Sequence, residues 1–553
     1  MASPIAWGAA FPINSNIKEN QFAPKIYALK DGSFVAVWTD NSETGADTDG
    51  GSIRGQFFNA DGSRKGAEFL VNTTTAGSQI NPDVTVLDDG RFVVAWQSGG
   101  YLWARGYNAN GSAIGNEFKA SSTGFDDHFA LTALTNGGFA VSYWDDDVKV
   151  RVQSFDANLQ KSGTEAVLAD NSDHTEIVGL QGQYIAFYGN GTSIHGQFRN
   201  NDGSMPTGSV TVDFSTPGSF NSKPVAAKLT DGRIIVIWTS QTESTAGPDL
   251  YQIKGQILNA NGTKSGGELL LSVPGAINAK AATVAALADG GFAVGYLDQI
   301  AGRNSADIHI SAFNGNGARV GTDTILDRAY DGDSTHALNI TTLADGRLAV
   351  TWTSVVSEWD DFGSSIHGQI VDLRQSGVTV TGTSADDRYY GSRFNDALKG
   401  EGGNDRLFGH EGNDVVAGGV GNDVLHGQGG NDTLTGGDGS DAFVFDTAPV
   451  VGRAKHIDRI VDFNGRADKI YLDDTIFKGL SKKVGSLDAP VKIDKKAFWK
   501  GQVAHDKDDR IIVKTSGEVL YDVDGTGKAK AVVVAKLDKK VLKFVDAGDF
   551  FEI

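Results

Sequence analysis

The sequence of 553 residues contains no cysteine, which excludes disulfide bonds, thiolate metal sites and cysteine nucleophiles. It also lacks any run of about 18 or more apolar residues, the length that a helix needs to span a bilayer. The start, MASPIAWGAAFPINSN, has neither the charged nor the apolar segment of a secretory signal. We therefore expect no membrane insertion and, if the chain is exported, no cleaved N-terminal signal.

Common catalytic motifs are missing as well. The chain has no G-x-S-x-G nucleophile elbow, no phosphate-binding loop and no dinucleotide fingerprint. Proline is scarce, with 11 residues, whereas glycine is abundant, with 71, and shows no collagen period. Together with 40% apolar residues, this composition predicts an all-β chain rich in turns rather than a disordered one.

Positive charge is also in short supply, and the formal net charge is -20. The imbalance is strongest over residues 382–444, where 4 Lys or Arg face 11 Asp or Glu. A chain this acidic repels the phosphates of nucleic acid and of anionic lipids, whereas it suits divalent cations. We therefore expect no nucleic-acid partner.

Residues 382–444 repeat a nine-residue pattern seven times, which we number as rows one to seven: GTSADDRYY, GSRFNDALK, GEGGNDRLF, GHEGNDVVA, GGVGNDVLH, GQGGNDTLT and GGDGSDAFV. Every row has aspartate at its sixth position, namely Asp387, Asp396, Asp405, Asp414, Asp423, Asp432 and Asp441. The eighth position is always apolar or aromatic, from Tyr389 in row one to Phe443 in row seven. A flexible glycine-rich linker, the alternative, would not keep aspartate at one position.

This spacing predicts a parallel β-roll. Glycines let the backbone turn with positive φ, and the short strand that follows needs only one inward side chain. Two rows then form one coil, so turns 18 residues apart lie on the same edge and bring carboxylates such as Asp405 and Asp423 together. With backbone carbonyls, about six hard oxygens form a Ca²⁺ site. Because stacked carboxylates repel each other without the ion, we expect folding and calcium binding to be one equilibrium.

At these residues the sequence resembles the repeats-in-toxin (RTX) nonapeptides of calcium-binding proteins exported by type I secretion machinery. The resemblance implies several Ca²⁺ ions and a secreted, extracellular or cell-surface location. The predicted aspartate ligands are Asp396, Asp405, Asp414, Asp423, Asp432 and Asp441. The resemblance implies that turn carbonyls complete the sites, from stretches that include Gly400, Gly402, Gly409, Gly418, Gly427 and Gly436. Row one departs from the pattern at Ser384 and Ala385, so Asp387 is not included.

Residues 446–553 are similar to the C-terminal domain of serralysin-type and rhizobial RTX proteins, which caps the roll. That domain ends in an uncleaved secretion signal, an acidic residue followed by apolar ones. The matching residues are Asp549, Phe550, Phe551 and Ile553, with Glu552 interrupting the apolar run. The zinc protease activity of serralysins is not implied, because the chain has no H-E-x-x-H motif.

A second repeat precedes the rows. Seven units share an apolar strand, a tight turn and a strand ending in an aromatic residue, and their turn glycines are Gly32, Gly90, Gly137, Gly182, Gly232, Gly290 and Gly346. The spacing of 45 to 58 residues suits a four-stranded propeller blade. We predict a seven-bladed β-propeller over 1–375, a parallel β-roll over 376–445 and a β-rich cap over 446–553. The segment AFPINSN resembles the fourth strand of a unit and is expected to complete the last blade.

Two connections of each blade, fourth strand to first and second to third, are expected on one face and are the longer ones. Aligned units place polar side chains of neighbouring blades there. The side chains concerned are Asn81, Asp126, Asp127, His128, Trp144, Asp173 and His174. Two imidazoles among carboxylates can bind a metal or perform acid–base catalysis, with His128 and His174 as the candidates. Solvated loop side chains are the alternative interpretation.

Two further sets of polar or aromatic residues occur in the propeller, one in a loop of the seventh unit and one in the third strands. The seventh unit contains SEWDDFGSS, in which Trp359 can stack on a sugar ring while Asp360 and Asp361 accept its hydroxyl hydrogens. The second residue of the third strand is Arg54, Trp103, Arg151, His195, Lys254, His309 or His367. For this set we expect pairing with polar groups of a neighbouring blade rather than a ring of ligands.

These features predict a secreted calcium-binding protein whose propeller binds an extracellular polysaccharide or cell-surface glycan, as a lectin or adhesin does. An extracellular polysaccharide lyase or hydrolase is the second interpretation. Against it, uronate chains need cations, and the expected functional face is poor in Lys and Arg. A bacteriocin-like or toxin-like role is the third, suggested only by the proteins in which RTX repeats occur.

Overall fold

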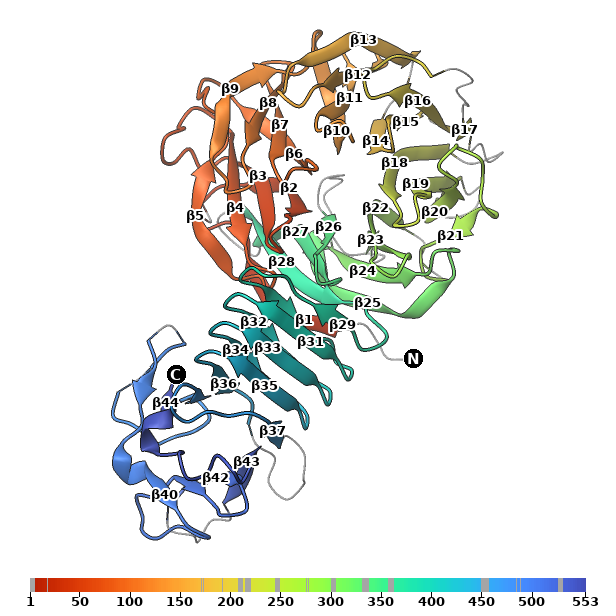
Figure 1. Cartoon of the computed structure of the whole chain (residues 1–553). Coiled ribbons are helices and arrows are strands. Elements are labelled where there is room, and N and C mark those ends of the chain that lie inside the picture. Colours follow the sequence, from red (N-terminus) through yellow and green to blue (C-terminus); the bar gives the residue numbers. More distant parts are fainter. Residues whose placement is uncertain are drawn as a thin grey trace. The chain divides into compact units, whose positions relative to one another are not determined.

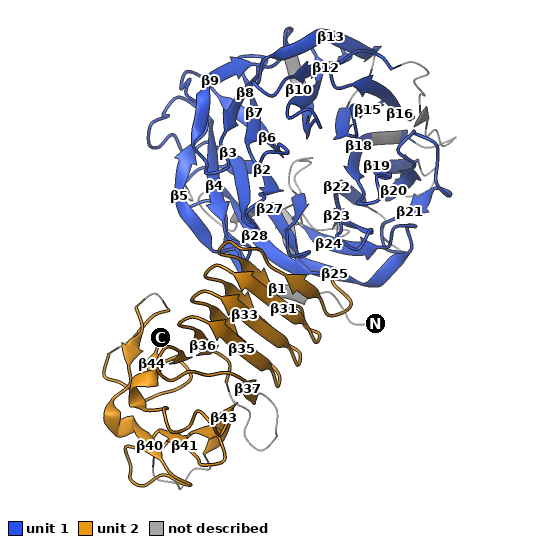
Figure 2. Ribbon diagram, viewed as in Figure 1, with its two compact units in different colours: residues 1–373 blue, residues 374–553 orange. Residues whose placement is uncertain are grey.

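The computed structural model describes the chain except residues 1–4, 17, 171, 173, 191, 207–211, 214–219, 244–248, 275, 277, 300–304, 331–337, 357–362, 449–456, 484, 488 and 526–530. The chain divides into two compact units, residues 1–373 and 374–553 (Figure 2). Apart from the 3₁₀ helices η1 (Lys495–Ala497) and η2 (Ala547–Asp549), the regular structure over the described residues is all β. None of the helices in this part of the chain has the length and apolar character needed to cross a membrane.

The first unit consists of seven four-stranded antiparallel sheets, the blades of a β-propeller (Figure 1). Blade one contains β2 (Gln21–Ala28), β3 (Phe34–Asp40), β4 (Ser52–Phe58) and β5 (Arg64–Leu70). Blade two contains β6 (Gln79–Val86), β7 (Phe92–Ser98), β8 (Tyr101–Tyr107) and β9 (Ala113–Lys119). Blade three contains β10 (Phe125–Ala133), β11 (Phe139–Asp145), β12 (Lys149–Phe155) and β13 (Lys161–Asp170). Blades four to six contain β14 (His174–Gly179), β15 (Gln183–Gly189), β16 (Ile194–Asn200), β17 (Val212–Asp213); β18 (Phe220–Lys228), β19 (Ile234–Thr242), β20 (Leu250–Leu258), β21 (Leu269–Leu270); and β22 (Ala279–Ala286), β23 (Phe292–Gln299), β24 (Ser305–Phe313), β25 (Arg319–Tyr330).

Blade seven joins the two ends of the propeller. It contains β26 (Leu338–Thr342), β27 (Leu348–Val356), β28 (Gly363–Asp372) and, as its fourth strand, β1 (Ile5–Pro12). β1 pairs antiparallel with β28, from Ile5 opposite Asp372 to Pro12 opposite His367. The first strands of successive blades contact one another, and β2 contacts β26, so seven strands encircle a common axis. The predicted seven-bladed propeller is therefore confirmed, and the N-terminal strand completes its last blade.

The first turn of each blade shows why this sequence pattern forms a hairpin. In blade one, Asp31 Oδ1 accepts the Ser33 N–H at 3.0 Å, and Gly32 takes a φ of 81°, which most side chains disfavour. The strand that follows, β3, is buried along its whole length, and its Trp38 is fully buried. Trp96, Trp238 and Trp352 occupy the same place in blades two, five and seven. Apolar packing between neighbouring sheets therefore holds the propeller together.

The second unit is built on two sheets whose roll strands are parallel. One sheet contains, in order, β29 (Thr379–Thr381), β31 (Ala397–Gly402), β33 (Val415–Val420), β35 (Thr433–Asp438), β37 (Asp458–Ile460), β43 (Val532–Leu537), β42 (Glu518–Tyr521), β41 (Ile511–Val513) and β40 (Phe498–Lys500). The other contains β30 (Arg388–Tyr390), β32 (Arg406–Phe408), β34 (Val424–His426), β36 (Ala442–Phe445), β38 (Lys469–Leu472), β44 (Phe550–Glu552) and β39 (Val491–Lys492).

The register of these sheets follows the row period. Ala397 lies opposite Val415, which lies opposite Thr433, so paired residues are two rows apart. The inward side chains come from the eighth row position, and they include Leu398, Leu407, Val416, Leu425 and Leu434, all fully buried. Residues after 445 extend both sheets and share this apolar core, for example through Ile460, Ile470 and Phe550. The predicted order of a propeller followed by a parallel roll is confirmed.

Candidate calcium sites and axial pocket

The row aspartates form two ladders, one along each edge of the roll. In each ladder, the backbone N–H of one aspartate donates to Oδ1 of the aspartate two rows later. On one edge these bonds join Asp387 to Asp405, Asp405 to Asp423 and Asp423 to Asp441, at 2.7, 2.8 and 2.9 Å. On the other edge they join Asp396 to Asp414 and Asp414 to Asp432, both at 2.8 Å. The ladders fix the carboxylates of successive coils at one spacing.

The second oxygen of most row aspartates has a different environment. Oδ2 of Asp405, Asp414, Asp423 and Asp441 is buried and has no hydrogen-bond partner among the described residues. It lies against the first glycine of its row: a Cβ added at Gly400 would come within 2.0 Å of Asp405 Oδ2. For Asp414, Asp423 and Asp441 the corresponding glycines are Gly409, Gly418 and Gly436. A buried carboxylate oxygen without a partner is costly, and a bound cation removes that cost.

Carbonyl oxygens of the next turn border the same space. Gly418 O would lie 2.6 Å from a Cβ at Gly400, and Gly427 O would lie 2.9 Å from one at Gly409. Gly402 belongs to the same turn as Gly400, and its N–H donates to Thr383 O at 3.0 Å. Carboxylate and carbonyl oxygens are the donors that Ca²⁺ prefers. The residues therefore fit the calcium ions that the rows predict.

The pKa values of the ladder aspartates also favour a bound cation. Burial raises the pKa of Asp414 to about 8 and the pKa values of Asp405 and Asp441 to about 6. Neighbouring carboxylates, such as Asp432 beside Asp414, raise these pKa values further. In the absence of a cation, the folded roll thus disfavours the ionised carboxylates. A Ca²⁺ ion at short range favours the ionised form instead.

Asp396, which the sequence places among the ligands, differs from those four aspartates. Its Oδ1 accepts the Val378 N–H at 2.6 Å, and its Oδ2 accepts the Ser392 N–H. Ser392 Oγ also donates to Oδ1, at 2.9 Å. Both carboxylate oxygens of Asp396 are therefore hydrogen-bonded within the protein.

Two further aspartates, Asp458 and Asp468, continue the ladders, and the row pattern does not predict them. The Asp432 N–H donates to Asp458 Oδ1, and the Asp441 N–H donates to Asp468 Oδ1, both at 3.1 Å. Burial and the neighbouring Asp432 carboxylate raise the pKa of Asp458. Both residues keep the order of aspartate, any residue and apolar residue found in the rows. This triplet could have indicated that Asp458 and Asp468 continue the ladders. It lies outside the nine-residue spacing, which ends at residue 444.

The propeller contains a pocket on its axis that encloses about 120 Å³. The first strands of six blades contribute to its wall. Among the lining residues are Lys25, Asn81, Asp83, His128, His174, Glu176, Lys223 and Ala281. The structure thus brings together Asn81, His128 and His174, and the centroids of the two imidazole rings lie 4.0 Å apart.

Over the described residues, a β-bulge shapes the first strand in five blades. The register shifts between Phe22 and Lys25 in blade one and between Ile80 and Asp83 in blade two, and blades three, five and six shift at the same place. The bulge residues Ala23, Asn81, Lys223 and Ala281 have φ values from 51° to 57°. A bulge re-aims the side chains beside it. The repeated bulge is therefore architectural, whereas the side chains that line the pocket differ between blades.

The charges of the pocket are mixed. Burial raises the pKa of Glu176 to about 8, the Asp83 carboxylate adds to the shift, and Lys25 opposes it. Burial likewise raises the pKa of Asp83, although Lys25 and the Leu131 N–H, at 3.1 Å, stabilise its charge. Lys223 also lines the pocket. Lys25 and Lys223, from blades one and five, thus bring cations to this pocket, whereas the sequence predicts a functional face poor in Lys and Arg.

Of the other predicted site residues, Trp144 has a described side chain. Trp144 is on β11 and does not belong to the pocket lining. Asp126 and Asp127 belong to β10, but their side chains are outside the described part of the chain. The residues that lie wholly outside the described ranges are Asp173, Trp359, Asp360 and Asp361.

The basic residues of the third strands pair within their own blade, so the expectation of pairing between blades is wrong where the partners are described. Arg54 Nε lies 3.3 Å from Asp40 Oδ2 in blade one, and Lys254 Nζ lies 3.0 Å from Glu268 Oε1 in blade five. Side chains on the same face of adjacent antiparallel strands are closer to each other than to the next sheet.

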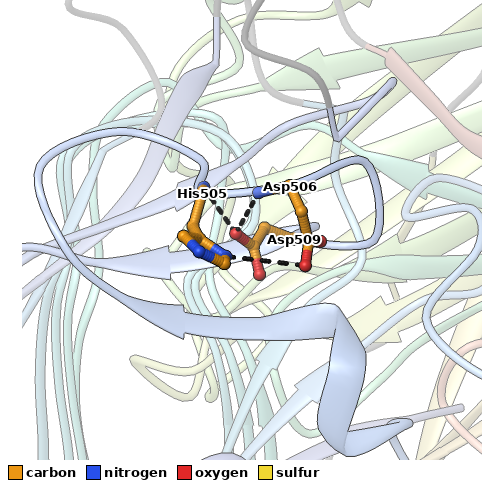
Figure 3. Close-up of side chains that lie close together, drawn as sticks. All are labelled: His505, Asp506 and Asp509. Atoms are coloured by element: carbon orange, nitrogen blue, oxygen red, sulfur yellow. Dashed lines mark hydrogen bonds and ion pairs between the residues drawn. The ribbon is translucent and has the colours of Figure 1, made fainter.

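A small cluster of metal-ligand types occurs in the second unit (Figure 3). His505, Asp506 and Asp509 each place one such atom within 4.8 Å of the others. However, the buried Asp509 Oδ2 accepts the backbone N–H groups of His505, at 2.5 Å, and Asp506, at 2.9 Å. The most buried carboxylate of the cluster closes its own loop, so we assign no ion there.

Residues 381–416 and 408–443 match the family model for the RTX calcium-binding nonapeptide repeat, a unit of four copies. The rows are therefore RTX calcium-binding repeats, and the matched residues include the sixth-position aspartate of all seven rows, from Asp387 to Asp441. No curated protein matches the chain.

Several solved structures resemble the chain at low identity. A Dyadobacter fermentans protein of unknown function is 12% identical, covering 68% of this chain and 100% of its own, with a TM-score of 0.42. A family PL25 ulvan lyase is 11% identical, covering 66% and 95%, with a TM-score of 0.42. The α-L-arabinofuranosidase Arb93A of Fusarium graminearum is 12% identical, covering 67% and 98%, with a TM-score of 0.38. At these scores the likenesses carry no argument about function.

Proposed function

We propose that the chain is an exported protein that folds with external calcium and uses its propeller to bind an extracellular glycan, in the manner of a lectin or adhesin. The observation that carries the proposal is the set of buried Oδ2 atoms of Asp405, Asp414, Asp423 and Asp441, which fit Ca²⁺. Such a roll is complete only where calcium is abundant. That condition favours the outside of a cell over its interior.

Residues 549–551 support export by type I secretion machinery. Asp549, Phe550 and Phe551 resemble the acidic and apolar residues of an uncleaved secretion signal. In the folded unit Phe550 is fully buried, and β44 pairs in parallel with β38. A signal at this position has to be read before the unit folds, and a calcium-poor interior keeps the unit unfolded until export.

The axial pocket is the proposed glycan site. Its lining combines ammonium, carboxyl, amide and imidazole groups with apolar contacts from Phe129, Pro82 and Val225. Hydroxyl groups of a sugar need donors and acceptors in alternation, and Lys25, Asp83 and the imidazoles supply both. Pockets lined in this way, with few convergent polar groups, are the usual form of small-molecule sites.

Retention on a panel of immobilised glycans tests this proposal in the presence of calcium. The test variant is His174→Ala, which removes a pocket side chain from blade four. The matched control is His195→Ala in the same blade, where the imidazole bonds Asn190 Nδ2 at 3.1 Å outside the pocket. Retention that falls at least tenfold in the first variant alone supports the axial site. Equal retention by both variants places the site elsewhere, and no retention on any glycan rejects the binding function.

A polysaccharide lyase or hydrolase is the second candidate, favoured by one specific observation. The rings of His128 and His174 lie 4.0 Å apart beside Glu176, whose pKa burial raises to about 8. Groups that change protonation near neutral pH can serve as general base and general acid. Ultraviolet absorbance of unsaturated products, or reducing ends, would reveal turnover during the retention assay. Turnover that disappears in the His128→Ala, His174→Ala double variant would favour the enzyme over the lectin.

A further inference from the structure

In the first two rows of the roll, the aspartate Oδ2 atom has hydrogen-bond donors that four of the later rows lack among the described residues. In row one, the N–H and the Oγ1 hydroxyl of Thr383 donate to Asp387 Oδ2, at 2.6 and 3.0 Å. In row two, the N–H of Ser392 donates to Asp396 Oδ2, and its hydroxyl bonds both carboxylate oxygens. In each case the donor stands four residues before the aspartate. Donors of the protein therefore bond Oδ2 of Asp387 and Asp396. Oδ2 has no partner among the described residues in Asp405, Asp414, Asp423 and Asp441.

The backbone at the second row position explains this difference. In rows three to seven that residue has a positive φ, with values of 73° at Glu401, 78° at His410, 120° at Gly419, 63° at Gln428 and 101° at Gly437. Thr383 and Ser392 are not among the residues with positive φ. A left-handed residue points its N–H in a different direction from a residue with negative φ. The donor thus faces the aspartate only in rows one and two.

The side chains of rows one and two stabilise this alternative turn. Thr383 Oγ1 accepts the Ala385 N–H, and Ser392 Oγ accepts the Phe394 N–H, both at 3.1 Å. Hydroxyl side chains form such local turns, which glycine at the same position cannot do. Ala385 and Phe394 also replace the glycine that stands at the fourth position of rows three to seven. Both substitutions favour a turn closed by hydrogen bonds.

The other end of one ladder is closed in a similar way. The Asn464 N–H donates to Asp468 Oδ2 at 2.7 Å, again from four residues before the aspartate. Asp462 accepts the N–H groups of Gly436 and Gly437, both at 2.9 Å, through its two carboxylate oxygens. The Asp462 carboxylate therefore binds the backbone of row seven, the last turn on this edge.

We infer that calcium binds only to rows three to seven, and that N–H groups of Thr383, Ser392 and Asn464 take the place of the ion at Asp387, Asp396 and Asp468. A cation and an N–H group compete for the same oxygen lone pair, and the positive end of the N–H dipole repels the cation. Binding an ion at Asp396 would break its bonds with Ser392 and turn the backbone. This inference rests on the proposed calcium binding, and it removes Asp396 from the predicted ligands.

The test counts calcium ions on the full chain by native mass spectrometry at saturating calcium. Asp396→Asn and Asp414→Asn form a matched pair, because both residues belong to the same ladder. The inference expects Asp414→Asn to lose at least one ion and Asp396→Asn to keep the wild-type number. Equal loss in both variants overturns the inference. A wild-type chain that binds no calcium would instead reject the proposed function, so the two failures are distinguishable.

A second variant keeps the aspartate and changes only the turn. Ser392→Gly combined with Phe394→Gly gives row two the glycines of row five. The inference expects this double variant to bind one ion more than the wild-type chain, because the second position can then take a positive φ. An unchanged ion count would overturn the claim that the N–H group excludes calcium from row two. This measurement remains decisive if Asp396→Asn fails to fold.

Discussion

The two units of this chain use repetition in opposite ways. Propeller blades bury large side chains between sheets, such as Trp38, Trp96 and Trp352, and this packing needs no ion. Each row of the roll contributes one inward side chain, such as Leu425, and one aspartate at the edge. The pKa is raised in four of these aspartates, Asp405, Asp414, Asp423 and Asp441. A nine-residue repeat has too little apolar surface to offset its stacked charges. We therefore expect the propeller to be stable without an ion and the roll to need calcium.

Removing calcium should separate the two units most strongly. In excess chelator, we expect residues 374–553 to lose most of their protection from amide hydrogen exchange, because the carboxylates then repel each other. Residues 1–373 should retain theirs. Exchange followed by mass spectrometry reports both units in one experiment. Similar loss, or similar retention, of protection in both units would show that calcium does not distinguish them.

Core truncation should reduce stability by similar amounts but under different conditions. Trp96→Ala in the propeller is expected to cost about 3–5 kcal/mol with or without calcium, because it opens a cavity in an ion-independent core. Leu425→Ala in the roll is expected to cost about 2–5 kcal/mol, and the loss should be measurable only with calcium bound. Denaturant unfolding at both calcium levels provides the measurement. A calcium-dependent effect of Trp96→Ala would contradict the division.

Acid should partly replace calcium in the roll. The pKa of Asp414 is raised to about 8 in the folded unit, so its protonated form contributes stability that is present below the unfolded value and is lost as pH rises through about 8. In chelator we therefore expect β structure of the roll to return at about pH 5. With calcium the slope reverses, because the ion requires ionised carboxylates. Circular dichroism against pH, with and without calcium, would show the two slopes; identical slopes would count against calcium at these carboxylates.

The smallest expected effect concerns Glu176 in the propeller. Its folded pKa of about 8 lies above its ordinary value of 4.5, so its contribution to stability is lost as pH rises through about 8. Glu176→Gln should remove that part of the pH dependence of the melting temperature. Calcium should not alter it. If the variant and the wild-type chain lose stability equally between neutral and alkaline pH, burial of this carboxyl is not what drives the change.

The sequence predicts the fold well because both repeats carry strong periods. The turn glycines near Gly32 and Gly346 delimit the blades, and aspartate at every ninth residue sets the coil of the roll. The alignment of the blades on their turns also predicts that His128 and His174 lie together, and their ring centroids are 4.0 Å apart. Periodic local signals determine these features directly.

Features that depend on an irregularity were not predictable in this way. Lys25 and Asp83 entered the pocket lining through bulges that shift the register of the first strands, and a bulge leaves little trace in the sequence. Asp458 and Asp468 continue the ladders after the nine-residue period has ended. The role of Ser392 depends on the sign of its φ, which the residue type influences but does not determine.

The pairing of β1 with β28 has a consequence for the order of folding. The seam joins Ile5 to Asp372, so it closes the longest loop in the propeller. The entropy of closing a loop grows only with the logarithm of its length, so the seam costs little at equilibrium. Contacts between such distant residues nevertheless form late. We therefore expect a nascent propeller to remain an open crescent during synthesis, with a vacant edge on β28 that the N-terminal strand, already made, closes at the end.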